Sequence, residues 1–164
     1  MLFSHWDSFR GGGLVPSLKD FLSRPHPQLQ PHLIMLDVIE PDQLRVRLFA
    51  TELVENAKID LTGLNLLSFT STPETSKELW NVVHEAAAHP CGTCNVLESI
   101  TNSGRTVTTE VVSLPLTPFP GGPPCVVTAV GPREELDFKD SNYRVVCYIE
   151  RGWLDIGAGV PRTA

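Results

Sequence analysis

Two strand-like segments separated by a very short link constrain the fold of this chain more than any other feature of its sequence. The first, HLIMLDVIE (32–40), is a nearly continuous apolar run of strand length. The second, QLRVRLFATEL (43–53), alternates, so that every second side chain from Leu44 to Ala50 is apolar and shares one face. Only the dipeptide PD lies between them. The two segments therefore predict an antiparallel β-hairpin.

One long helix is predicted after this hairpin. The segment STPETSKELWNVVHEAAAH (71–89) starts with Thr72 before Pro73, a common signal for a helix N-terminus, and Pro90 should end it. Shorter helical turns, broken at Gly63, fill the space between the hairpin and this helix. The chain thus has a block of helices after its first two strands.

Two short helices are expected at the N-terminus. One begins at Leu2 and carries Phe3, Trp6 and Phe9 along one side, and Ser17 is the N-cap of the other. An apolar stripe of this kind is costly to leave in water. It must cover a free face of the sheet, either of its own chain or of a second copy.

Three further strands follow the long helix. They are NVLESIT (95–101), RTVTTEVVSLPL (105–116) and CVVTAVG (125–131). The last apolar stretch, YRVVCYIE (143–150), has a periodicity that fits a strand or a helix. Strands split by a block of helices indicate an α+β fold, with helices packed on one face of an antiparallel sheet.

The composition fits one compact domain that acts in the cytoplasm. The chain has 164 residues, 41% of them hydrophobic, which suffices for a single core. Its net charge of −6 argues against nucleic-acid binding. The first ten residues lack the apolar core of a signal peptide, and no stretch approaches the ~20 apolar residues of a membrane span. Four cysteines without a secretory signal are expected to be thiols in a reducing cytosol.

Several short motifs follow one another in a characteristic order. They are HWDSFRGGGLVPSLKDF, LIMLDVIEPDQLRVRLFATEL, DLTGLNLLSF, VVSLPL and LDIGAGVP, and they extend from Trp6 to Pro161. Together with the order of elements, they resemble the short bacterial proteins of the PAS domain superfamily. The resemblance implies a five-stranded antiparallel sheet with helices inserted between the second and third strands. It divides the chain into an N-terminal helical extension (1–31), a PAS core (32–131) and a C-terminal extension (132–164).

The resemblance also implies a role. PAS domains act in sensing and signal transduction, so we expect a non-catalytic module that binds a small ligand or a signalling protein partner. PAS domains often dimerise through flanking helices, which favours a homodimer in which Trp6 contacts the second copy. Neither the identity of a ligand nor the partner follows from the sequence.

Two cofactor signatures of the superfamily can be checked against individual residues. Flavin-binding photosensory members carry a reactive cysteine in a Gly-x-Asn-Cys segment. The segment GLNL matches it at Gly63 and Asn65 but has Leu66 at the cysteine position, so adduct chemistry cannot occur there. Haem-binding members use a histidine of the long helix, where His84 is available; a lone helical histidine is more often a surface residue. The cofactor therefore stays unknown.

Strand alternation and the helical stripe select six candidates for a pocket between the sheet and the long helix. They are Leu36, Leu48, Leu79, Val83, Val111 and Val126.

The segment HPCGTCN (89–95) offers an alternative function, a small thiol-redox or zinc-binding protein that uses Cys91 and Cys94, with His89 as a third metal ligand. A reactive pair needs a helix N-terminus or a nearby cation, whereas this pair follows a helix and precedes a strand. A zinc site needs a second ligand pair, and no second CxxC exists. We therefore expect two ordinary thiols.

Enzymatic signatures are missing as well. The sequence has no Gly-x-Ser-x-Gly elbow and no His-Glu-x-x-His helix. The glycine-rich LDIGAGVP (154–161) resembles a methyltransferase loop, but such a loop requires a helix and the rest of a βαβ sheet after it. We expect that the protein is not an enzyme.

Overall fold

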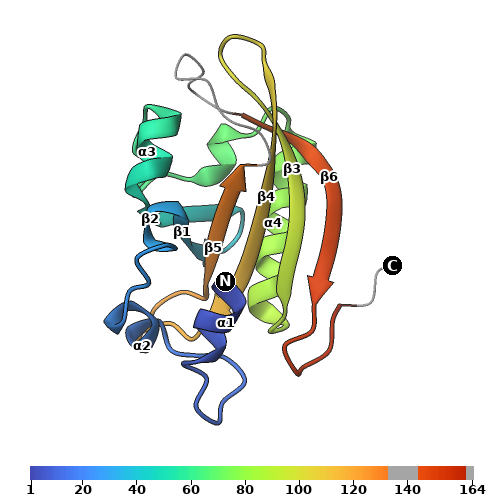
Figure 1. Cartoon of the computed structure of the whole chain (residues 1–164). Helices are drawn as coiled ribbons and strands as arrows, with labels where there is room; N and C mark the ends of the chain where they lie inside the picture. The colour runs from blue at the N-terminus through green and yellow to red at the C-terminus, as the bar shows by residue number, and fades with distance from the viewer. Residues whose placement is uncertain (133–143, 162–164) are drawn as a thin grey trace.

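One antiparallel sheet organises the computed structural model, which describes residues 1–132 and 144–161 and has six strands within those ranges (Figure 1). The strands lie in the order β2-β1-β5-β4-β3-β6, and each neighbouring pair is antiparallel. Their bounds are β1 Leu33–Ile39, β2 Gln43–Phe49, β3 Gly92–Ile100, β4 Thr106–Leu116, β5 Cys125–Pro132 and β6 Arg144–Leu154. The predicted hairpin is confirmed as β1 and β2.

Helices cover both faces of this sheet. Figure 1 shows α1 in front of the sheet and α4 behind it; we call these the outer and the inner face. The helical elements are α1 Leu2–Asp7, α2 Leu18–Ser23, η1 Gln30–His32, α3 Thr51–Ala57, η2 Leu66–Phe69 and α4 Pro73–Ala88. The block α3-η2-α4 lies between β2 and β3 in the chain, as predicted. Within the described ranges, no helix has both the length and the apolar character needed to cross a bilayer.

Side-chain caps fix the starts of α2 and α4. The Thr72 hydroxyl accepts a hydrogen bond from Thr75 N at 3.2 Å, with Pro73 as the first helical residue of α4. The Ser17 hydroxyl accepts one from Asp20 N at 3.0 Å and so caps α2. Both caps satisfy N–H groups that a helix start otherwise leaves unpaired. The predicted helix starts are confirmed.

The sixth strand corrects the predicted count of five. The stretch that fitted a strand or a helix forms β6, which pairs with β3 from Gly92 opposite Leu154 to Ile100 opposite Arg144. Without it, β3 would be an edge strand with a row of unpaired backbone groups. Part of the C-terminal extension therefore belongs to the sheet. Two parts of that segment, 133–143 and 162–164, lie outside the described residues.

The outer face has a core of its own, centred on Trp6. This side chain is fully buried, and its Nε1 donates a hydrogen bond to Pro115 O at 2.7 Å. The buried residues packed together here are Leu2, Trp6, Leu18, Phe21, Leu29, Leu33, Met35, Leu114, Leu116, Cys125, Val127 and Ile156. The N-terminal stripe thus covers the sheet of its own chain. The prediction that Trp6 contacts a second copy is wrong, because its side chain has no exposed surface with which to contact another molecule.

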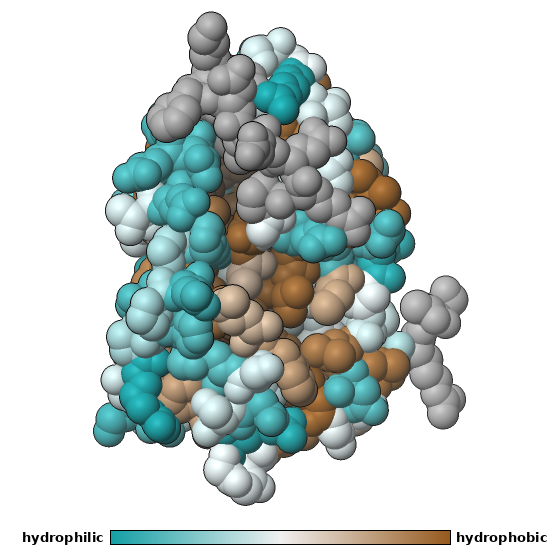
Figure 2. Space-filling model, viewed as in Figure 1, coloured by the Kyte–Doolittle hydropathy of each residue, from teal (hydrophilic) through white to brown (hydrophobic). Residues whose placement is uncertain are grey.

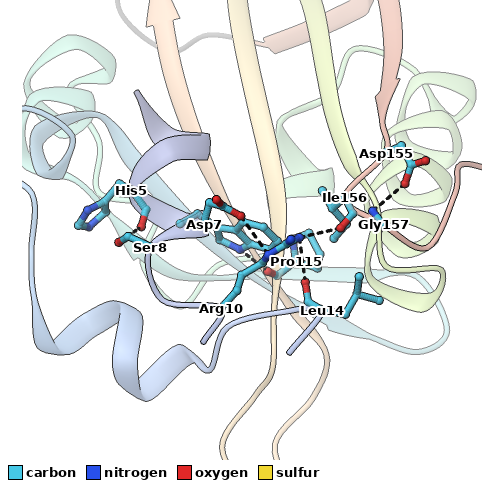
Figure 3. A network of polar contacts seen from close by, with 10 residues as sticks. His5, Asp7, Ser8, Arg10, Leu14, Pro115, Asp155, Ile156 and Gly157 are labelled. Atoms are coloured by element: carbon cyan, nitrogen blue, oxygen red, sulfur yellow. Dashed lines mark hydrogen bonds and ion pairs between the residues drawn. The ribbon is translucent and has the colours of Figure 1, made fainter. Parts of the chain in front are cut away.

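Arg10 joins this N-terminal segment to the loop after β6, an arrangement that we call the Arg10 latch (Figure 3). Its Nη1 donates to Ile156 O at 2.6 Å, and its Nε pairs with Asp7 Oδ1 at 3.0 Å. The guanidinium lies 5.4 Å from the centre of the Trp6 ring. Two motifs far apart in the sequence, HWDSFRGGG and LDIGAGVP, therefore meet on the outer face.

The glycine-rich loop is itself a tight turn. Asp155 Oδ1 accepts hydrogen bonds from Gly157 N at 2.7 Å and from Gly159 N at 2.9 Å (Figure 3 shows the first). These two bonds lower the pKa of the Asp155 carboxyl, because they stabilise its charged form. Gly157 and Gly159 have φ of 113° and 82°, which favour glycine. The glycines of this segment are therefore needed for the backbone conformation of the turn.

A β-bulge in the hairpin reverses the face of Leu48. Met35 lies opposite Leu48, but the next residue, Leu36, lies opposite Val46, so Arg47 is an extra residue in β2. Such an insertion breaks the alternation of side chains. Leu48 consequently packs against the outer core, whereas Val46 belongs to the inner one. The prediction that Leu48 lies between the sheet and the long helix is wrong.

The two leucines of β2 offer a matched test of this register. Leu44 is fully buried in the inner core and Leu48 is only partly buried at the outer one. Leu44→Ala should lower the free energy of unfolding by about 2–5 kcal/mol, and Leu48→Ala by about 1 kcal/mol. Chemical denaturation measures both. A larger loss for Leu48→Ala would contradict the bulge.

Candidate ligand-binding cavity

A cavity of about 220 Å³ lies between the inner face of the sheet and the helices α3, η2 and α4. Most of its wall is apolar. The apolar side chains include Ile34, Leu36, Phe49, Leu53, Ala57, Ile59, Leu61, Leu66, Phe69, Leu79, Val82, Val83, Leu97, Val107, Val111, Val130 and Val145. Since protein interiors are close-packed, a void of this size is unusual inside a small domain.

Polar side chains interrupt this apolar wall along the sheet, and we call the buried ones among them the polar floor. It consists of Thr93, Asn95 and Ser99 on β3, Ser113 on β4 and Thr128 on β5, and each of them is buried and lines the cavity. Asn95 Nδ2 donates to Thr93 Oγ1 at 3.1 Å. The hydroxyls of Ser113 and Thr128 share a hydrogen bond of 2.8 Å. The floor is polar but uncharged.

The acidic and basic side chains of the described lining lie near the rim of the cavity. They are His32 and Glu52, and His32 Nε2 lies 3.5 Å from Glu52 Oε2. Both side chains are well exposed, at 36% and 48%. They come from the end of η1 and the first turn of α3, so this is the side on which the cavity approaches solvent.

Contacts between α4 and β6 close the cavity on another side. Thr75 Oγ1 donates to Val146 O at 2.7 Å, and Arg151 Nη1 pairs with Glu78 Oε1 at 2.8 Å. Tyr148, also on β6, lines the cavity. Burial raises the pKa of its phenol, and the nearby Glu78 carboxylate raises it further, so Tyr148 is neutral at physiological pH.

The six predicted pocket residues are distributed as follows. Four line the cavity: Leu36, Leu79, Val83 and Val111. Val126 belongs to the inner core but does not line the cavity, and Leu48 lies on the outer face. The polar floor was not predicted, because only apolar residues were considered as pocket candidates. Its signal is present in the sequence, since Thr93, Asn95 and Ser99 share one face of β3, with Leu97 between the last two.

A family comparison agrees with this architecture. A model of the PAS domain matches residues 1–130, which include the N-terminal helices as well as the core. The chain belongs to the PAS domain family. PAS domains of this fold are sensory modules.

Several solved structures with similarity to this PAS domain are LOV proteins. They include a Rhodobacter sphaeroides LOV protein (13% identity, 63% of this chain and 60% of that chain, TM-score 0.49). A fungal LOV domain photoreceptor has 18% identity over 68% of this chain and 85% of that chain, with a TM-score of 0.48. The blue-light photoreceptor Aureochrome1 LOV has 15% identity over 66% and 85%, with a TM-score of 0.48. Among curated proteins, the search found no match.

The GLNL segment of this PAS domain has a structural role. Gly63 has φ of 85°, and Asn65 Oδ1 accepts hydrogen bonds from Leu44 N and Leu67 N, both at 3.1 Å. Asn65 therefore caps η2 and fastens it to β2. Leu66, which stands where flavin-binding members have their cysteine, lines the cavity. The cavity wall has an alkyl group at that position in place of a thiol.

His84, the candidate haem ligand, lies outside the cavity lining. Its Nε2 is 2.9 Å from Glu40 Oε1, and its ring stacks on Trp80 at 4.3 Å. An axial ligand would need this nitrogen free and directed into the pocket. The geometry engages His84 on the surface of α4 instead.

The two cysteines of HPCGTCN differ in their surroundings. Cys91 is buried just before β3, and burial, together with the Glu85 and Asp155 carboxylates, raises its thiol pKa to about 11. Cys94 is exposed on β3, and partial desolvation and Glu110 raise its thiol pKa. Both shifts disfavour the thiolate that redox chemistry or zinc binding requires. Across the described residues, no three His, Cys, Asp or Glu side chains are grouped for a metal ion.

Thiol alkylation tests these environments. At pH 8 a thiol with a pKa of about 11 is roughly 0.1% thiolate, so Cys91 should resist iodoacetamide while the exposed Cys94 reacts first. The Cys91 rate should rise about tenfold per pH unit toward pH 11, as long as the protein stays folded. Peptide mass spectrometry follows each site. Faster alkylation of Cys91 in native than in unfolded protein would show an activated thiol.

Proposed function

We propose that this PAS domain is a non-catalytic sensory module that binds a small molecule in the inner cavity. The observation that carries the proposal is the cavity itself, a void of about 220 Å³ with an apolar wall and a polar floor. Ligand sites generally combine an apolar lining with a few placed polar groups. A void maintained at the expense of packing contacts is expected to have a use.

Signalling by such a module requires a ligand that distinguishes two packings of the domain. The cavity is bounded by α4 through Leu79 and Val83 and by β6 through Val145 and Tyr148. A ligand that fits only one arrangement of these two elements shifts the equilibrium toward it by its difference in affinity. This mechanism needs no reacting group, in keeping with a non-enzymatic role.

We place the module in the cytoplasm and expect its output through a signalling partner or a second copy. The four cysteines are free thiols, which supports a reducing compartment. Figure 2 shows brown apolar surface on the outer side of the domain, in the centre and toward the lower right. Phe3 on α1 is 38% exposed and Met1 is 67% exposed. These residues support self-association without the participation of Trp6.

The homodimer can be tested separately from the fold. Phe3→Glu changes an exposed residue of α1, so it should leave the melting temperature nearly unchanged and lower the dimer fraction. Trp6→Glu buries a charge in the outer core and should unfold the domain instead. Light scattering and circular dichroism separate the two effects. A monomeric wild type at high concentration would exclude the dimer.

Filling the cavity tests ligand binding. Val111 points into the cavity and its neighbour Val112 points to the outer face, so Val111→Phe and Val112→Phe form a matched pair. Native mass spectrometry should find a small molecule on the wild type and on Val112→Phe, and none on Val111→Phe. The physical reason is steric, since an added ring occupies much of the void.

The melting temperatures of Val111→Phe and Val112→Phe serve as the control, because they show that both variants are folded. If no small molecule is retained by wild-type protein, and none of a set of compounds of about ten non-hydrogen atoms raises its melting temperature, the proposed ligand-binding function is wrong.

A further inference from the structure

We propose that the cavity selects an uncharged ring compound of about ten non-hydrogen atoms that carries a hydrogen-bonding group, and that the polar floor holds this group. The inference rests on the proposed ligand-binding function and adds the chemical class of the ligand. It follows from the size of the cavity, from the arrangement of its hydroxyls and from the distribution of charge.

The size of the cavity sets the size of the ligand. A dry engineered protein cavity of about 150 Å³ binds benzene, which has six non-hydrogen atoms. The present cavity has a volume of about 220 Å³. In proportion, it holds about nine or ten non-hydrogen atoms, which is a fused pair of rings.

Three hydroxyls form a row across the floor. Thr93 on β3 lies opposite Ser113 on β4, and Ser113 lies opposite Thr128 on β5. Neighbouring strands are about 4.8 Å apart, so the row extends over roughly 10 Å, close to the length of two fused rings with their hydrogens. Asn95 stands two residues along β3 from the first hydroxyl and widens the row into a polar patch. A flat ligand lying on the sheet would present an edge or a face to this patch.

The floor retains hydrogen-bonding capacity for such a ligand. The Ser113–Thr128 pair uses one of its two hydroxyl hydrogens, so the other is free to point into the cavity. Asn95 donates from Nδ2 to Thr93 Oγ1, and its Oδ1 forms no hydrogen bond with the described residues. The Ser99 hydroxyl also has no partner among them, but Ser99 is six residues from Thr93 along β3, about 20 Å away, and so lies beyond the reach of the same ligand. Since Ser113, Thr128 and Asn95 line the cavity, the free hydroxyl hydrogen and Asn95 Oδ1 can bond to a ligand there.

The charges around the cavity exclude an ionised ligand from its interior. The polar floor is neutral, and Tyr148 stays protonated because its pKa is raised. The described charged groups of the lining, His32 and Glu52, pair with each other near solvent. Among the described lining residues, a buried carboxylate or ammonium would therefore find no counter-ion in the interior, and the cost of its desolvation would not be offset.

Four compounds of nine non-hydrogen atoms each test this inference. Indole, benzofuran and indene share one bicyclic skeleton; indole offers a donor, benzofuran an acceptor and indene neither. Benzoate has the same number of non-hydrogen atoms and carries a charge. Isothermal titration with wild-type protein should give indole about tenfold tighter binding than indene, benzofuran in between, and no measurable binding of benzoate.

Substitutions in the floor assign the selectivity to its hydroxyls. Thr128→Val keeps the shape of the side chain and removes its hydroxyl, and Ser113→Ala removes the partner. Each change, and the pair together, should bring the indole-to-indene ratio toward one. Thr108→Val, on the same strand as Ser113 but facing away from the cavity, should leave the ratio unchanged. Circular dichroism shows which variants are folded, and Thr128→Val alone suffices if the double change unfolds the domain.

The outcomes distinguish this inference from the proposed function. If indene binds the wild type as tightly as indole does, or if the indole-to-indene ratio is unchanged in folded Thr128→Val, the polar floor does not select the ligand. Binding of a small molecule in the cavity would remain supported in both cases. Binding of benzoate as tight as that of indole would overturn the exclusion of charge. Failure of all four compounds to bind, together with no retained molecule in the native protein, would contradict the proposed function itself.

Discussion

Every part of this domain depends on covering a sheet that is apolar on both faces. The strands β1, β4 and β5 direct Met35, Leu114 and Val127 outward and Leu36, Val111 and Val126 inward. A sheet exposed on either side would leave a large apolar area in water, at about 25 cal/mol per Å². The chain meets this constraint with two separate covers, one from its N-terminus and one from the helices between β2 and β3. Each cover packs in its own way.

The two covers are built differently, although both leave some space. The outer cover is anchored by Trp6, which is fully buried and donates a hydrogen bond to the sheet backbone, and a hollow of about 420 Å³ lies beside it among Phe21, Leu29 and Leu48. On the inner side, the short elements α3 and η2 arch over the sheet and leave the cavity between themselves and the strands. Large side chains with fixed contacts suit a permanent core. A partly filled space lined by several short elements suits a ligand that comes and goes, because those elements can adjust separately.

The limits of prediction from this sequence have physical causes. Local patterns sufficed for the hairpin, for α4 with its cap at Thr72 and for four of the pocket residues, because periodicity and capping are local. Leu48 failed because a bulge changes the face of a residue without changing the pattern of the sequence. The intramolecular place of Trp6 depends on Pro115, which is 109 residues away. The polar floor emerges only when β3, β4 and β5 are brought into register.

β6 lies at one edge of the sheet and links the cavity with the N-terminal segment. Its Val145 and Tyr148 border the cavity, and the loop that follows it is held at Ile156 by Arg10 of the N-terminal segment. The pairing of β6 with β3 shifts register twice, between Glu150 and Tyr148 and between Cys147 and Val145, so the strand is irregular beside the cavity. The Arg10 guanidinium bonds to a backbone oxygen, whose position follows the chain and not the identity of any side chain. A movement of β6 beside a bound molecule would therefore be resisted on the opposite side of the sheet by this hydrogen bond and by the burial of Ile156 in the outer core.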